Sequence, residues 1–152
     1  MLITNHVLCG ALVGLATSKP TTAFALGTAS HLALDVTPHW GDPDQGVFLR
    51  VAVVDGLVGL ATMAYVARLT PGWRRTAVLA GMLGACLPDA DKPSNLFFGR
   101  SPFPAAVDRF HDAIQRESPR RLPQEFVVAS LQLLAFAALV RRTVRAPGQQ
   151  PE

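Results

Sequence analysis

Five apolar segments, separated by turns that contain Pro or Gly, run through most of the chain. Breakers such as Lys19-Pro20 and Thr70-Pro71-Gly72 divide them, and no alternation of apolar and polar positions indicates a β-strand. The pattern predicts an all-α fold, a bundle of about four to five helices. The segments are Leu2 to Ser18, Thr21 to Thr37, Val47 to Leu69, Thr76 to Leu87 and Phe126 to Val140.

A longer polar connection, residues 91–124, joins the last two segments and contains one amphipathic stretch. Pro104 to Glu117 would place Val107, His111 and Ile114 on one face of a short helix. We expect this helix to lie across one end of the bundle. Residues 1–145 then form a single helical domain, and residues 146–152 form a disordered tail.

The composition favours embedding in a membrane. Apolar residues make up 49% of the chain and charged residues only 16%, whereas about 25% of the residues of a soluble domain are charged. Arg68 and Arg141 stand at segment ends, where arginine can reach the membrane interface. Gly10 and Gly14 have the spacing of closely packed membrane helices. Only the third segment reaches the roughly 20 residues of a full span, so a soluble all-α protein is the alternative.

These features predict a multi-pass protein of the bacterial inner (cytoplasmic) membrane, with the lipid bilayer as its partner. Although the net charge is +3, the basic residues stand at helix ends and do not form one stripe. Nucleic-acid binding is therefore not expected.

An up-and-down path of the five segments would bring the histidines and most carboxylates to one end of the bundle. The first segment begins there, the second and fourth end there, and the cross-helix lies over it. Histidine and carboxylate side chains are common metal ligands. The candidate residues are His6, His31, Asp35, Asp55, Asp89, Asp91 and His111.

His31 and Asp35 form the strongest motif, because residues four apart lie on one helix face and can bind one ion. Asp35 could instead orient His31 through a hydrogen bond, or the two could be an ordinary surface pair. Burying both groups inside an apolar segment without a partner would be costly, which favours a functional site.

Asp89 and Asp91 follow the helix-ending Pro88, where two carboxylates can reach a metal from a loop. A solvated helix end is the alternative, but negative charge is unfavourable at a helix C-terminus. Asp55 lies in an apolar stretch, and an ionisable residue inside a membrane span is a candidate functional residue. Its alternative is an ion pair with Arg50.

The chain resembles a family of membrane-bound metal-dependent hydrolases, one branch of which is described as LexA-binding inner-membrane-associated hydrolases. The resemblance covers roughly residues 1–115. It rests on His6 before Gly10 and Gly14, on the stretch from Ser30-His31 through Asp35 to Pro38-His39, and on Leu87-Pro88-Asp89-x-Asp91. The HxxxD element is also similar to that of the all-α zinc-dependent phospholipase C and single-strand nuclease fold.

The resemblance implies a helical bundle that holds one or more divalent metals and hydrolyses phosphoesters. The metal ligands it implies are His6, His31, Asp35, Asp89 and Asp91. The family usually has a His-Arg-Gly-x-Thr-His element after its PDxD motif. Here that region reads Gly99-Arg100-Ser101-Pro102-Phe103, and the next histidine is His111. A ligand is therefore missing, or His111 replaces it.

The first hypothesis for function is a membrane-bound hydrolase of a phosphoester or lipid. Zinc or manganese would activate water, Asp55 or Asp91 would act as general base, and His111 would take part in catalysis. The second is a non-catalytic integral membrane protein with a structural metal or a polar cluster. The third is ion or proton transport through Asp35 and Asp55.

Overall fold

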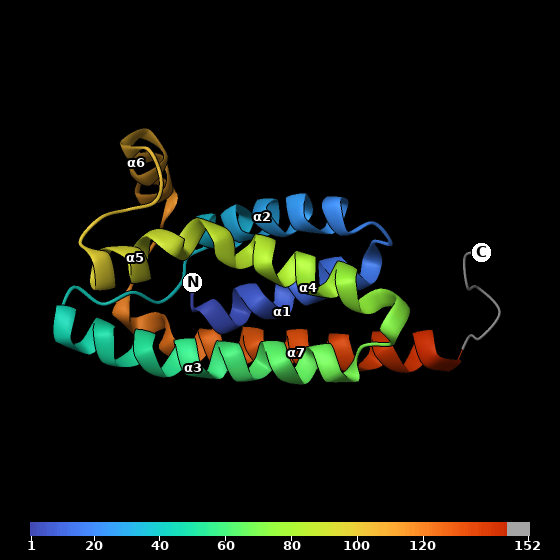
Figure 1. Cartoon of the computed structure of the whole chain (residues 1–152). Coiled ribbons are helices and arrows are strands. Elements are labelled where there is room, and N and C mark those ends of the chain that lie inside the picture. The colour runs from blue at the N-terminus through green and yellow to red at the C-terminus, as the bar shows by residue number, and fades with distance from the viewer. Residues whose placement is uncertain (146–152) are drawn as a thin grey trace.

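The computed structural model describes residues 1–145, which form the all-α fold predicted from the sequence (Figure 1). Within this range no β-strand occurs, and a single parallel bridge joins His39 to Glu117. The predicted tail, residues 146–152, lies outside the described part. The chain passes in order through α1 (Ile3–Ala16), α2 (Pro20–Val36), α3 (Gln45–Leu69), α4 (Gly72–Cys86), the 3-10 turn η1 (Leu87–Ala90), α5 (Asp91–Phe98), α6 (Ala105–Ile114), the 3-10 turn η2 (Pro119–Arg121) and α7 (Leu122–Arg145).

Local sequence explains several of these boundaries. Pro20 occupies the first turn of α2, where a missing backbone N–H costs nothing. The side chain of Asp44 caps α3 by accepting hydrogen bonds from the backbone N–H groups of Gly46 and Val47, at 2.8 and 3.0 Å. α5 ends at Gly99, whose φ of 68° is the left-handed conformation common after a helix.

The five apolar segments and the amphipathic cross-helix are all present as helices. Two differences are instructive. Residues 91–98, expected to be part of a connection, form α5. The last helix is longer at both ends than its apolar stretch. Two helical stretches, Gln45–Leu69 and Pro119–Thr143, are thus long and apolar enough to cross a membrane, where one was expected.

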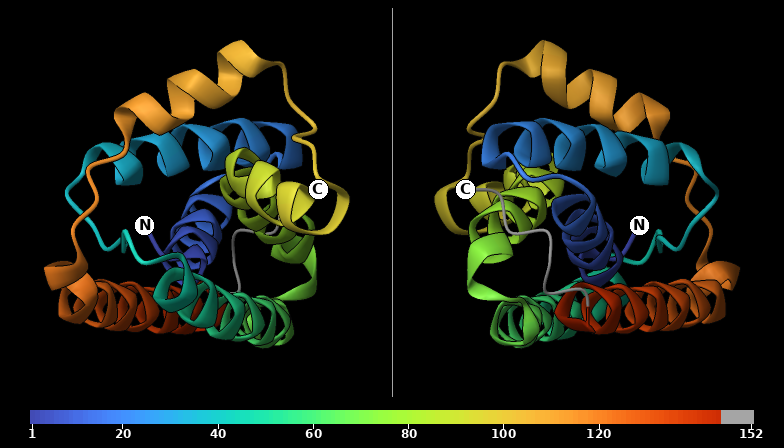
Figure 2. Two further views of the ribbon diagram at one scale, coloured as in Figure 1. Left: turned by 90° about the vertical axis from the view of Figure 1, so that its left-hand side faces the viewer. Right: turned by 90° about the vertical axis from the view of Figure 1, so that its right-hand side faces the viewer.

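The helices run up and down, as assumed (Figure 1). The N-terminus, the α2–α3 loop and α5 lie toward one end of the molecule, and the α1–α2 and α3–α4 turns lie at the other. We call the first of these the site end. α6 lies outside the bundle at the site end, next to α2, and it does not run parallel to the bundle axis (Figures 1 and 2).

Glycines bring α1, α2 and α4 into close contact. A Cβ atom on Gly81 of α4 would collide with the backbone carbonyl of Gly10 in α1, and one on Gly27 of α2 would collide with that of Gly81. Small residues allow helix backbones to approach in this way. The predicted role of Gly10 and Gly14 as packing residues is confirmed, since a Cβ on Gly14 would also collide with the backbone of Val78 in α4. We call the three helices α1, α2 and α4 the inner trio.

α3 and α7 both pack against α1 and lie below it, where they form a second layer (Figure 2). A small core, containing Val7, Val66, Met82 and Phe136, joins this layer to the inner trio. Elsewhere the layer presents large apolar side chains to the outside, including Leu57, which is 65% exposed, and Leu131, which is 62% exposed.

Candidate metal centre

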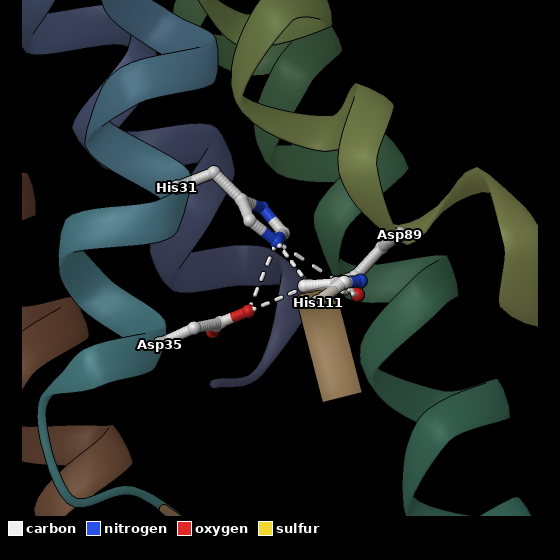
Figure 3. A group of neighbouring side chains, drawn as sticks. All are labelled: His31, Asp35, Asp89 and His111. Carbon is white, nitrogen blue, oxygen red and sulfur yellow. Dashed lines mark hydrogen bonds and ion pairs between the residues drawn. The ribbon is translucent and has the colours of Figure 1, made fainter. Parts of the chain in front are cut away.

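Four side chains from three parts of the fold meet at the site end: His31 and Asp35 from α2, Asp89 from η1 and His111 from α6 (Figure 3). All four residues are buried. Each offers one ligand atom, and these atoms lie within 4.8 Å of one another. We call this group the His/Asp cluster.

Three of the ligand atoms form a nearly equilateral triangle. His31 Nε2 lies 3.0 Å from Asp35 Oδ2 and 3.0 Å from His111 Nε2, and His111 Nε2 lies 3.0 Å from Asp35 Oδ2. Asp89 Oδ1 completes the group at 3.9 Å from His31 Nε2 and 3.8 Å from His111 Nε2.

The backbone fixes the tautomer of His31. Its Nδ1 lies 2.7 Å from the carbonyl oxygen of Ala85, and a carbonyl can only accept, so Nδ1 carries a hydrogen. In the neutral ring Nε2 then has a free lone pair. That lone pair faces a carboxylate oxygen of Asp35, which is also an acceptor. Two acceptors at 3.0 Å repel each other unless a proton or a metal ion lies between them.

The spacing of the cluster suits a divalent metal ion. Four ligand atoms bonded at about 2.1 Å to one tetrahedral ion lie about 3.4 Å apart. Five of the six separations in the cluster, from 3.0 to 3.9 Å, lie on either side of this value, and all six are within 4.8 Å. Two histidines with one carboxylate also form the facial arrangement that binds iron or related metals. The Ala85 carbonyl supplies the outer hydrogen bond that usually orients a histidine ligand.

Lys92 provides a positive charge beside the cluster. Its Nζ lies 2.7 Å from Asp89 Oδ1, and its side chain remains 34% exposed. Burial alone would raise the pKa of Asp89, but the Lys92 ammonium and the nearby histidines outweigh it and hold that pKa below its usual range. Burial would lower the pKa of Lys92, but the Asp89 carboxylate raises it. Both groups are therefore ionised at neutral pH.

His6 lies next to the cluster but is not one of its four members. Its ring stacks on that of His31, with centroids 3.9 Å apart. His6 Nε2 lies 3.2 Å from Asp35 Oδ1, yet both ring nitrogens are buried and form no hydrogen bond of good geometry. Asp35 Oδ1 instead accepts a hydrogen bond from the α-amino group of Met1 at 2.8 Å. His6 stays a predicted ligand, in contact with the cluster through Asp35.

Asp91 is also buried but lies outside the cluster. It begins α5 and is 8% exposed, and its Oδ1 has no hydrogen-bond partner. Burial raises the pKa of the Asp91 carboxyl, which makes it a stronger base. Its raised pKa agrees with the predicted role as general base, and its role as a metal ligand stays a prediction, because Asp91 is not among the four members of the cluster.

Asp55 has a structural partner that the sequence did not suggest. α1 has no side-chain cap of its own, and Asp55 of α3 accepts hydrogen bonds from the backbone N–H groups of Ile3 and Thr4 and from Thr4 Oγ1. A carboxylate at this position satisfies free N–H groups and favours the positive end of the helix dipole. The expected roles of Asp55 as general base, and as ion-pair partner of Arg50, find no support here.

Glu125 was not singled out in the sequence. It is 1% exposed and accepts hydrogen bonds from the backbone N–H of Leu2 at 3.1 Å, the Asn5 amide at 2.7 Å and the backbone N–H of Trp40 at 2.9 Å. The only signal was a carboxylate next to an apolar stretch. Glu125 and Asp55 together hold the start of α1 beside the cluster.

His39 is buried in the α2–α3 loop and does not join the cluster. Its Nδ1 lies 2.8 Å from the Thr37 carbonyl oxygen, and its Nε2 lies 3.9 Å from Glu117 Oε1. Its backbone bonds to the segment after α6 on both sides, through Arg116 O and Ser118 N. His39 therefore helps to anchor the segment that follows the helix carrying His111.

The chain matches no protein-family model, no curated protein and no solved structure. The resemblance to membrane-bound metal-dependent hydrolases stays a prediction from the motifs, and the geometry described above is the basis for a functional assignment.

Proposed function

We propose that this protein is a membrane-embedded metal-dependent hydrolase whose divalent ion is held by His31, Asp35, Asp89 and His111. The observation that carries the proposal is the triangle of ligand atoms, in which His31 Nε2 is left with a lone pair by the Ala85 carbonyl. Zinc or manganese fits this mixture of imidazole and carboxylate ligands.

Such an ion would lower the pKa of a bound water and so supply a hydroxide nucleophile at neutral pH. The side chains of this chain support hydrolysis of an anionic ester such as a phosphoester. The partly exposed ammonium of Lys92 attracts a negatively charged substrate to the cluster. Asp91, with its raised pKa, can accept the proton from the attacking water.

Membrane embedding is supported by the exposed apolar faces of α3 and α7. Only 11% of the most apolar window in each of these helices is buried, so neither behaves as the core helix of a soluble protein. We propose that both cross the bacterial inner membrane and place the cluster at one membrane surface.

The second candidate function is non-catalytic, with a polar cluster that stabilises the bundle. The observation in its favour is the Lys92–Asp89 ion pair, which already neutralises one of the two carboxylates of the cluster. A proton shared between His31 and His111 would then remove the remaining repulsion from Asp35.

Metal content distinguishes a metal centre from a polar cluster. The protein would be purified in mild detergent without a polyhistidine tag and analysed by mass spectrometry, beside the His31→Ala/Asp35→Ala variant. The matched control is Arg109→Ala/Asp112→Ala, which removes two exposed charged side chains of α6 outside the cluster. Near-stoichiometric metal in the native protein and the control, with none in the first variant, is the expected result. Metal-free native protein after reloading with zinc and manganese would favour the polar cluster.

A further inference from the structure

A pocket of about 190 Å³ opens between α2, η1 and α6, directly beside the His/Asp cluster. Its wall is apolar and comes from all three elements. The residues that form it are Leu32, Leu87, Pro88, Phe103, Val107 and Phe110.

The polar side chains at the edge of the pocket already have partners. Thr28 Oγ1 lies 3.1 Å from the Gly84 carbonyl oxygen and donates its hydrogen within the bundle. Asp108 Oδ1 accepts a hydrogen bond from Ser101 Oγ at 2.9 Å. The surface that lines the pocket is therefore almost entirely apolar, and it suits a hydrocarbon chain.

His111 connects this pocket to the cluster. Its ring lines the pocket, while its Nε2 belongs to the triangle with His31 and Asp35. A molecule whose chain fills the pocket would thus have its polar end beside the ligand atoms. The pocket and the cluster together therefore suit a molecule that has an apolar chain and a polar head group.

The mouth of the pocket carries apolar side chains that are left exposed. Phe110 is 56% exposed, Val107 is 46% exposed and Leu87 is 40% exposed. Val107 and Phe110 lie on α6, which has charged residues on its other face, among them Arg109 and Asp112. A helix of this kind is typical of the membrane surface, so the mouth is suited to receive a chain from a lipid layer.

We infer that the pocket binds the hydrocarbon chain of the substrate, and that the substrate is an amphiphile with an anionic ester head group. This inference rests on the proposed hydrolase function and specifies its substrate class. Each methylene group that enters the pocket tightens binding by about fourfold. The hydrocarbon chain of the substrate thus supplies affinity, and the cluster supplies the chemistry.

The test uses dodecyl phosphate that carries a diazirine in its chain as a photoreactive probe, added to the full-length protein in detergent. Mass spectrometry after illumination identifies the labelled residues. We expect label on pocket residues of α6 and η1. Val107→Trp fills the pocket with an indole ring and should reduce this labelling by about 15-fold, as expected for displacing two methylene groups.

Leu83→Trp is the matched control, since it adds the same ring to an exposed position on α4 that does not line the pocket. It should leave the labelling unchanged. Label confined to the exposed faces of α3 and α7, or label in the pocket that Val107→Trp does not reduce, would overturn the inference.

Metal content, measured in the same preparations, separates this inference from the proposed function. A labelled pocket in a protein that holds no metal would refute the hydrolase and leave a chain-binding pocket. A metal-loaded protein without label in the pocket would retain the metal centre and exclude the amphiphile. Native metal content in Val107→Trp shows that this variant is folded.

Discussion

The inner trio and the α3–α7 layer are both apolar, yet they use their apolar residues in opposite ways. In the trio, small residues such as Gly10 and Gly81 bring backbones together and leave no room for larger side chains. In the layer, large side chains such as Leu57 and Leu131 point outward and contact little else of the chain. Apolar composition alone thus does not distinguish a helix surface that packs inside the protein from one that is left exposed.

The polar side chains divide in the same way. The histidines and aspartates of the cluster lie on the trio and on the short elements attached to it, whereas Asp55 and Glu125 of the layer bind the start of α1. The trio and its attached elements therefore carry the cluster, and the layer holds the start of α1 in place. Four predictions test this division, from the largest expected effect to the smallest.

The largest effect is expected from a methyl group added inside the trio. Gly81→Ala places a Cβ against the backbone carbonyl of Gly10, which cannot move aside, and should cost about 1–3 kcal/mol or more. The midpoint of thermal unfolding should fall and metal should be lost. Gly56→Ala is the control in α3, where a Cβ meets nothing within 4 Å, and should stabilise the helix by about 1 kcal/mol. Equal midpoints of thermal unfolding for the two variants would contradict the difference in packing between the inner trio and the α3–α7 layer.

Asp89→Asn should weaken metal binding by at least about 100-fold, because outer-shell partners alone contribute up to that factor. The amide has nearly the size of the carboxylate, so the fold should persist. Competition with a coloured chelator measures the affinity. Asp112→Asn, on the exposed face of α6, should bind metal like the native protein. If both variants bind alike, Asp89 is no ligand and acts only as the partner of Lys92.

A charge on the outer face of the layer should interfere with membrane insertion. Leu57→Lys places an ammonium near the middle of α3 at a cost of about 2.5–3.5 kcal/mol. We expect a smaller fraction of the protein to resist extraction from membranes at alkaline pH. Arg50→Lys, near the start of the same helix, is the control. A soluble helical protein would instead become more soluble with Leu57→Lys, and that outcome would refute the membrane assignment.

Acid should release the metal at a higher pH than an ordinary histidine site would. The hydrogen bond to Asp35 raises the pKa of His111, although burial opposes it. A histidine ligand must lose its proton before it binds the ion, so affinity is complete above the raised pKa and falls as the pH drops through it. Zinc titrations across neutral and mildly acidic buffers check this. An affinity that is constant down to the ordinary histidine pKa would contradict it.

The helices and the site end could be predicted because their signals are local. Pro and Gly mark the turns, and the number of segments fixes which ends share a side. One pair of the cluster, His31 and Asp35, could be predicted from its spacing on one helix face. The packing role of Gly10 and Gly14 followed from their spacing in the same way.

The remaining features depend on contacts that leave no trace in the local pattern. Asp55 was correctly expected to be buried, but its partner is the start of α1, and free backbone N–H groups at a helix start have no sequence signature. The last helix was predicted too short because its ends are polar. Pro123 is tolerated in the first turn, and Arg141 and Arg142 continue the helix beyond the apolar stretch.

The three hydrogen bonds accepted by the Glu125 carboxylate have a consequence for the order of events during synthesis. This residue holds Leu2 and Asn5, more than a hundred residues earlier in the chain, together with Trp40 of the α2–α3 loop. A ribosome delivers the inner trio long before it delivers α7, so the start of α1 must wait without its buried partner. The site end would therefore reach its final form only after the last helix has docked, so the docking of α7 is the step that completes folding.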